Sequence, residues 1–318
     1  MKLTENSTPD VKFRVALFLL CAIFVACACI FVPYAGVQND EVLFAGPLFH
    51  DHPREYTVRA FKHDVPLMLL SYLGAAKTWL FGAIFRTFHS GIWQLRLPVI
   101  LIGAATLAAL FLLFRRAAGP FAAATACLLL SLDPLYVLTT TFDWGPVALQ
   151  HLLLACAMLY FVLACAKGSP LHAAAGAFAA GLGMWDKALF LWMASGAGFA
   201  ALLLYGREMR AFLRPRMIAA LVLGFVLGAA PLIVYNIRHP LKTFQGNFHF
   251  APEELPKKAR LLEGCLSGEG LDGYIPGEEW RDHPRQPRSA LEHASVAIRD
   301  AIGKDLTRVP VRPGDIAF

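Results

Sequence analysis

Apolar residues form long, nearly uninterrupted runs over the first 240 residues of the chain, and short polar segments separate these runs. An α-helix rises about 1.5 Å per residue, so about 20 apolar residues cross the hydrocarbon core of a bilayer, which is about 30 Å thick. The first run is longer than the apolar core of a cleaved signal peptide, and we interpret it as a retained span. Runs of sufficient length predict membrane spans near residues 13–35, 97–114, 120–138, 145–166 and 217–236.

Residues 171–205 form an apolar stretch that is too long for a single crossing. Asp186 and Lys187 interrupt it near its middle, where charges would be costly inside the hydrocarbon core. We therefore expect two short spans joined by a tight polar turn, which brings the predicted number of spans to seven.

The segment 66–88 is apolar enough to be a further span, but it contains Lys77 and Arg86. Cytoplasmic loops of membrane proteins collect Lys and Arg, and this rule decides between the two alternatives. We expect a cytoplasmic N-terminus, and the segment is then predicted to be an amphipathic helix at the outer membrane interface. Leaving it out of the spans places these basic residues in the cytoplasm: Arg115, Arg116, Lys167, Arg207, Arg210, Arg214 and Arg216.

From about residue 241 the chain becomes polar and rich in proline, which breaks long helices. We expect a transmembrane domain over residues 1–240 and a polar extracytoplasmic tail over residues 241–318, the tail being part of a longer loop. The one helical candidate in this tail is the segment 289–302, which has an imperfect apolar face.

Composition supports a membrane location, because 57% of the 318 residues are hydrophobic and only 16% are charged. A soluble fold could not cover that much apolar surface. The sequence predicts an all-α integral membrane protein with about seven transmembrane helices, an outer-face interfacial helix and a polar C-terminal tail. The net charge of +6 follows from the basic loops, so we expect no nucleic-acid partner. Six of the seven cysteines lie in apolar runs and are interpreted as packing residues.

The predicted topology brings ionisable residues from four separate loops to the outer membrane face. Charges at membrane depth are costly, so such a cluster is a candidate for function. The loops concerned contain the motifs NDEVLF, TFDWGP, MWDKALFLW and PLIVYNIRHP. The residues that they contribute are Asp40, Glu41, Asp143, Asp186, Lys187, Asn236, Arg238 and His239.

Structural roles are open for each of these residues. The acidic pair after the first span could be solvated, Asp143 could cap the helix that starts near Gly145, and Asp186 and Lys187 could form an interfacial salt bridge. His63 and Asp64 precede the interfacial segment and are expected to cap its helix. Arg238 and His239 could contact lipid headgroups.

In order and spacing these segments resemble the membrane glycosyltransferases of the C fold type. Specifically, they resemble the family-39 group, which includes protein O-mannosyltransferases and lipid A aminoarabinose transferase. The resemblance covers roughly residues 10–250. Members of this group continue through further spans, so we expect this chain to be C-terminally truncated, either as a fragment or as a reduced enzyme. The segments that carry the resemblance are Asp40 with Glu41, HDVPLMLL, LRLPVILIG, FRRAAG, Asp143, Lys187 and PLIVYNIRH.

The resemblance implies an inverting transfer of a hexosyl or pentosyl sugar on the outer, periplasmic face of the cell inner membrane. The donor would be a polyprenyl-phosphate sugar, and the acceptor a hydroxyl of a lipid, a glycan or a protein. In that family an Asp after the first span is the proposed base, which corresponds to Asp40. We expect no cofactor, with a divalent metal as the alternative. The other expected site residues are Glu41 and Asp143 to orient the acceptor or the base, Lys187 and Arg238 to bind the departing phosphate, and His63, Asp64 and Asp186 as accessory groups.

Two other functions compete with this hypothesis, a transporter and a non-enzymatic membrane partner. Transporters tend to contain internal repeats and to place charges near the midplane of the bilayer. Here the charges are predicted at one face and the sequence contains no apparent repeat, which favours the enzyme.

Overall fold

The structure is a computed structural model that describes residues 11–33, 36–49, 54–60, 63–143, 147–245, 252–267 and 293. The chain divides into two compact units, residues 1–250 and residues 251–318, and each is described by itself. The long helices of the first unit are α1 (Val11–Phe31), α4 (Ile92–Ala118), α5 (Pro120–Leu132), α6 (Pro134–Thr141), α7 (Val147–Lys167), α8 (Pro170–Asp186), α9 (Phe190–Met209), α10 (Pro215–Gly228) and α11 (Ala230–Arg238).

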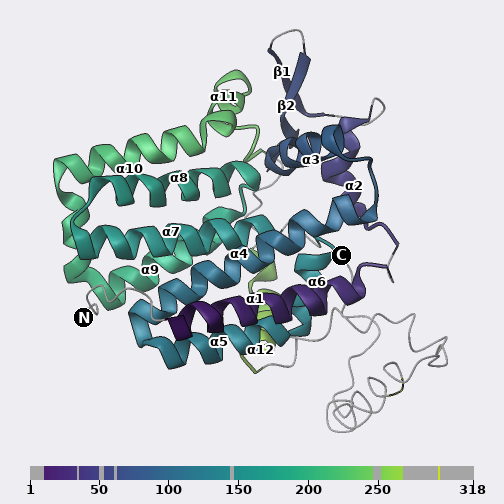
Figure 1. The fold of residues 1–318 in the computed structure, drawn as a ribbon. Helices are drawn as coiled ribbons and strands as arrows, with labels where there is room; N and C mark the ends of the chain where they lie inside the picture. Colours follow the sequence, from purple (N-terminus) through teal and green to yellow (C-terminus); the bar gives the residue numbers. More distant parts are fainter. Residues whose placement is uncertain are drawn as a thin grey trace. The chain divides into compact units, whose positions relative to one another are not determined.

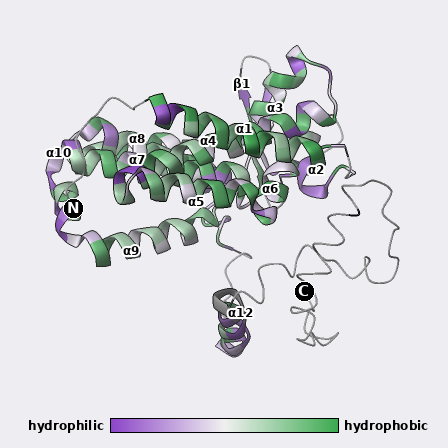
Figure 2. Ribbon diagram, turned by 60° about the horizontal axis from the view of Figure 1, so that its bottom comes forward, coloured by the Kyte–Doolittle hydropathy of each residue, from purple (hydrophilic) through white to green (hydrophobic). Residues whose placement is uncertain are grey.

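These helices lie side by side and form the body of the first unit (Figure 1). Helix α4 contacts α1, α5 and α7, while α8 contacts α7 and α10. Hydrophobic residues cover the bundle, and hydrophilic residues concentrate toward the helix ends (Figure 2). Glycines allow α8 and α10 to approach closely, since a Cβ atom on Gly224 would collide with the backbone of Ala174.

Among the described residues, three helices, α1, α4 and α7, are long and apolar enough to cross a membrane. Two bent pairs raise this number to at most five if each pair counts as one span, namely α5 with α6 and the segment Phe190–Leu213 with α10. Helix α8 has 17 residues, about 26 Å at 1.5 Å per residue, so it falls short of a full crossing by length. The protein is therefore a helical membrane protein, and the count of seven spans stays a prediction.

The predicted span 120–138 is broken into α5 and α6, which meet at an angle of 64°. Asp133 caps α6 by accepting a hydrogen bond of 2.6 Å from the backbone N–H of Tyr136. Pro134 occupies the first position of α6, where proline is well tolerated. In the sequence, Asp133 and Pro134 only briefly interrupt an apolar run, but in the structure they mark the boundary between two helices.

The segment 66–88 is not one helix, so this prediction was wrong in its first part. Residues His63–Leu70 form strand β2, which pairs antiparallel with β1 (Tyr56–Ala60) and with β3 (Leu73–Gly74). Helix α3 begins only at Ala76 and ends at Thr87. A short apolar run fits a buried strand as well as a helix, and periodicity alone does not separate them.

The elements that follow the first apolar helix gather at one end of the bundle. Helix α2 (Asn39–Ala45), the short helix η1 (Gly46–Leu48), the β-hairpin, α3 and α11 all lie toward this end (Figure 1). The turns that contain Asp143 and Lys187 belong to the same end, because α6, α7, α8 and α9 run antiparallel in succession (Figure 1). We call it the loop end of the bundle.

In the second unit the structure describes η3 (Pro252–Glu254) and α12 (Leu255–Ser267). The sequence pattern did not indicate α12, because Pro256 and several charged residues conceal a helix. The helix predicted at 289–302 lies outside the described residues, apart from His293.

Candidate functional site

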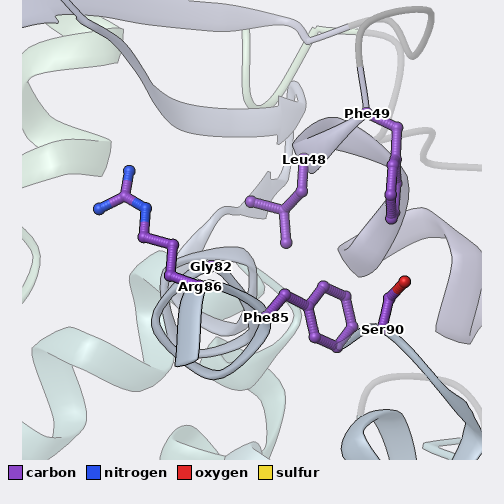
Figure 3. Close-up of a pocket in the computed structure, with 6 residues that line it drawn as sticks. All are labelled: Leu48, Phe49, Gly82, Phe85, Arg86 and Ser90. Carbon is purple, nitrogen blue, oxygen red and sulfur yellow. The ribbon is translucent and has the colours of Figure 1, made fainter. Parts of the chain in front are cut away.

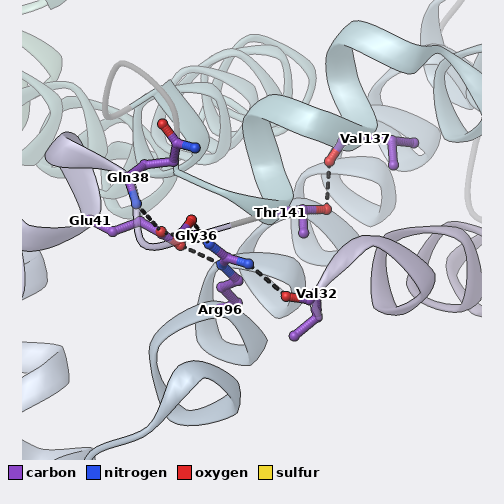
Figure 4. Close-up of polar contacts among 7 residues, drawn as sticks. All are labelled: Val32, Gly36, Gln38, Glu41, Arg96, Val137 and Thr141. Carbon is purple, nitrogen blue, oxygen red and sulfur yellow. Dashed lines mark hydrogen bonds and ion pairs between the residues drawn. The ribbon is translucent and has the colours of Figure 1, made fainter. Parts of the chain in front are cut away.

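Glu41 and Arg96 form a buried ion pair at the loop end of the bundle (Figure 4). The guanidinium group of Arg96 donates from Nε to Glu41 Oε1 at 2.7 Å and from Nη2 to Oε2 at 2.9 Å. It also donates to the carbonyl oxygens of Val32 and Gly36, at 2.6 and 2.8 Å. Arg96 thereby ties the end of α1 and the start of α2 to α4, in the two-point geometry that arginine favours.

Both carboxylate oxygens of Glu41 are therefore in use. Oε2 accepts a second hydrogen bond of 2.8 Å from the backbone N–H of Gln38, which closes a capping box at the start of α2. A residue bound in this way fixes the backbone of α2.

Lys77 and Asp143 form a second buried ion pair, between the first turn of α3 and the turn after α6. The ammonium Nζ donates to Asp143 Oδ2 at 2.5 Å and lies 3.5 Å from the centre of the Phe44 ring. Asp143 Oδ1 has no hydrogen-bond partner among the described residues. Burial raises the pKa of Asp143, and the charge of Lys77 opposes this shift.

The backbone of Asp143 is also unusual, with a φ of 49°, which places a non-glycine residue in the left-handed region. Such conformations are uncommon and are seen most often for Asn and Asp. One carboxylate oxygen of Asp143 is committed to Lys77, in an ion pair across 66 residues of sequence. The alternative role as a helix cap concerns residues 144–146, which lie outside the described part of the chain.

Asp186 and Lys187 lie in the turn between α8 and α9. The side chain of Asp186 is fully buried, and neither of its carboxylate oxygens has a hydrogen-bond partner within the described part of the chain. Its charge interacts with Lys77, Asp143 and Lys187. A salt bridge between the two neighbours was one alternative, and the described contacts give them an electrostatic interaction without a salt bridge.

The backbone of this turn is held firmly against the hairpin. Ala188 N–H donates to Tyr72 C=O at 2.9 Å, and Leu73 and Lys187 form an isolated β-bridge. Gln150 donates to the carbonyl of Lys187 at 3.2 Å. The ammonium group of Lys187 is half-buried and makes no hydrogen bond or ion pair with the described residues.

Asp40 is half-buried in the first turn of α2. Its charge acts on both Asp143 and Lys187, although more than a hundred residues separate it from each. Burial lowers the pKa of the Lys187 ammonium, and Asp40 is the foremost group that opposes this shift. The structure thus brings Asp40, Asp143, Asp186 and Lys187 into one electrostatic cluster, which we call the acidic cluster.

The remaining predicted residues lie outside the acidic cluster. Arg238 is exposed at the end of α11, and no contact with the cluster is seen among the described residues. His63 and Asp64 begin strand β2, and Asp64 is exposed opposite Arg59, so neither caps α3 as expected. Tyr235 donates to Glu55 Oε1 at 2.8 Å and so joins α11 to the residue that precedes β1.

Sequence analysis missed the roles of Lys77 and Arg96, the two cations that hold the loop end together. Each stands in an otherwise apolar segment, and such a cation needs a buried counter-ion. That signal was visible in the sequence, but it does not say which carboxylate is the partner. Among the described residues, no three His, Cys, Asp or Glu side chains lie close enough together to hold a metal ion.

Comparison with known proteins gives one positive result. Residues 74–235 match a family described as dolichyl-phosphate-mannose-protein mannosyltransferase. The matched segment runs from β3 to α11 and so includes Lys77, Arg96, Asp143 and Lys187, while Asp40 and Glu41 precede it. Neither the curated proteins nor the solved structures contain a match to the chain. The match spans half of the chain, and the protein accordingly belongs to this family of membrane glycosyltransferases, whose members use a lipid-linked sugar donor.

Proposed function

We propose that the protein transfers a sugar from a polyprenyl-phosphate donor to an acceptor hydroxyl at the outer, periplasmic face of the inner membrane, with inversion at the anomeric carbon. The observation that supports this most is the acidic cluster, in which the half-buried carboxylate of Asp40 and the half-buried ammonium group of Lys187 interact electrostatically, although they come from distant parts of the sequence. The family match favours a transferase over the transporter and the non-enzymatic partner.

In the proposed reaction Asp40 is the general base. As the acceptor oxygen forms its bond to the anomeric carbon, its proton passes to Asp40. The bond from that carbon to the phosphate oxygen breaks, and the electron pair leaves with the polyprenyl phosphate. General-base help of this kind contributes about 10²- to 10⁴-fold to a rate.

Lys187 is the proposed partner of the departing phosphate. The charge of Lys77 also acts on the cluster, but its ammonium group is already bound to Asp143 and lies against the Phe44 ring. A cation that is not committed elsewhere can stabilise the charge that develops on the leaving group. Arg238 is kept as a second candidate because α11 is anchored next to the hairpin through Tyr235.

The other residues have supporting roles in this proposal. Glu41 orients the base, because its pair with Arg96 fixes the helix that carries Asp40. Asp143 orients the acceptor through its second carboxylate oxygen, and Asp186, His63 and Asp64 remain accessory candidates.

Removing the charge of Lys187 should weaken the use of the donor more than the chemical step. For Lys187→Ala we expect KM for a polyprenyl-phosphate sugar to rise about tenfold, which is the loss of one charge-assisted contact of about 1.5 kcal/mol. Lys258→Ala in α12, an exposed lysine in an i,i+4 pair, serves as the control. An unchanged KM in the Lys187 variant would remove this residue from the donor site.

The side of the membrane is tested by reporter fusions. A fusion at Arg210 should report the cytoplasm, and a fusion at Ala259 should report the periplasm, since an odd number of crossings is expected before the second unit. If both reporters were found in one compartment, the transfer could not be placed at the outer face.

A further inference from the structure

A cavity of about 280 Å³ lies beside α3 (Figure 3), and none of its lining residues belongs to the acidic cluster. Arg86 follows Lys77 by nine residues on α3, so the two cations are about 13 Å apart along the helix axis. The cavity is at the lower end of the size range of small-molecule sites. It is lined by Leu48, Phe49, Gly82, Phe85, Arg86 and Ser90.

The lining combines an apolar chamber with one cation. Leu48, Phe49 and Phe85 supply apolar side chains, and the two phenylalanine rings lie 6.5 Å apart. Gly82 keeps the chamber open, because a Cβ atom there would lie 3.2 Å from Leu48 Cδ2. Arg86 is exposed, and the structure gives its guanidinium group no ion pair or hydrogen bond with a described residue.

The surroundings of the cavity have the composition of a membrane interface. Trp79, Leu80 and Phe88 of the α3 region and Trp93 at the start of α4 are all exposed, at 37–59% of their surface. Aromatic rings with nearby cations are typical of the level of the lipid headgroups. A cavity with apolar side chains at this level is open to a lipid chain, and an arginine that has no partner among the described residues is open to a lipid phosphate.

We infer that this cavity is a binding site for an anionic phospholipid of the bilayer, with part of an acyl chain beside Gly82 and the phosphate on Arg86. The site is separate from the one proposed for the sugar donor, whose phosphate lies at Lys187. Charge and position support a bilayer lipid as the occupant, because the cation and the apolar chamber are next to each other at the interface. Binding of such a lipid does not require contacts to a sugar.

The test uses the full chain in phosphatidylcholine nanodiscs that contain a photoactivatable phosphatidylglycerol. We expect crosslinks at residues 48–49 and 82–90. Arg86→Gln should lower their yield about fivefold, the effect of one cation near a lipid phosphate. Gly82→Leu, which fills the chamber, should lower it at least as much. Unlabelled phosphatidylglycerol should compete with the label, and a polyprenyl phosphate should not.

The controls are Gly206→Leu and Arg207→Gln, which make the same two changes at exposed positions on α9, where a Cβ atom on Gly206 meets nothing. Both should keep the wild-type crosslinks. Arg86 is on the surface, so its variant keeps the test valid even if Gly82→Leu does not fold. Equal crosslinking in Arg86→Gln and wild type, or equal competition by polyprenyl phosphate, would overturn the inference. Neither result depends on transferase activity.

Discussion

Replacing Asp40 with asparagine should lower the rate of sugar transfer by about 10²- to 10⁴-fold, the usual contribution of a general base. Asparagine has the same shape as aspartate but accepts no proton from the acceptor hydroxyl. Asp40 is half-buried in the first turn of α2, so the protein should fold and express as the wild type does. The measurement is transfer from a polyprenyl-phosphate sugar by the full chain in membranes, with the expression level recorded.

The matched control for Asp40→Asn is Glu253→Gln, which makes the same change of carboxylate to amide at an exposed position in the second unit. It should keep the wild-type rate. Full transfer by the Asp40 variant would show that another group takes the proton. A loss of expression together with activity would instead make Asp40 a structural residue and remove the support for its catalytic role.

Replacing Lys77 with methionine should destabilise the protein by about 3–5 kcal/mol, the cost of breaking a buried ion pair by removing one partner. Methionine fills a similar volume but leaves the buried carboxylate of Asp143 without its cation, and it also removes a charge that acts on Asp186. The free energy of unfolding in detergent, measured with a chemical denaturant, tests this expectation.

A double variant separates the ion pair from simple packing. Asparagine tolerates the left-handed backbone of residue 143, so Asp143→Asn combined with Lys77→Met removes both charges without new backbone strain. We expect the double variant to be more stable than Lys77→Met alone, with a coupling energy of about 0.5–3 kcal/mol. Strictly additive losses would contradict the pair as a coupled unit.

Lys242→Met provides a comparison for the Lys77 variant. The ammonium of Lys242 lies 3.8 Å from Glu55, and its side chain is 54% exposed. Exposed pairs of this kind contribute about 0–1 kcal/mol, so the loss of stability should be several times smaller than for Lys77. The difference between the losses in free energy of unfolding of the two lysine variants would measure how strongly burial increases the cost of removing one partner of an ion pair.

Under the proposed function the two buried cations are positioning residues, and neither touches the substrate. Arg96 fixes the helix that carries Asp40, and Lys77 fixes the turn that carries Asp143. Loss of either cation would then move a carboxylate of the acidic cluster rather than remove it.

The hydrophobic pattern by itself determined the class of protein and the places of most helices. A run of about 20 apolar residues has few stable states other than a helix in or against a membrane, because its backbone must satisfy its own hydrogen bonds there. This is why α1, α4 and α7 coincide with predicted spans. The turn at Asp186 and Lys187 was predicted for the same reason, since charges interrupt an apolar helix visibly.

Only the tertiary structure decided which charges meet. Ion-pair partners such as Lys77 and Asp143 are 66 residues apart, and no local spacing rule connects residues at that distance. The strand at residues 63–70 also depends on tertiary contacts. Its backbone pairs with β1 and β3, and two of its carbonyl oxygens accept hydrogen bonds from the indole N–H groups of Trp79 and Trp185. Local sequence sets the conformations that a segment can adopt, while its hydrogen-bonding and charged partners, supplied by distant parts of the chain, select one of them.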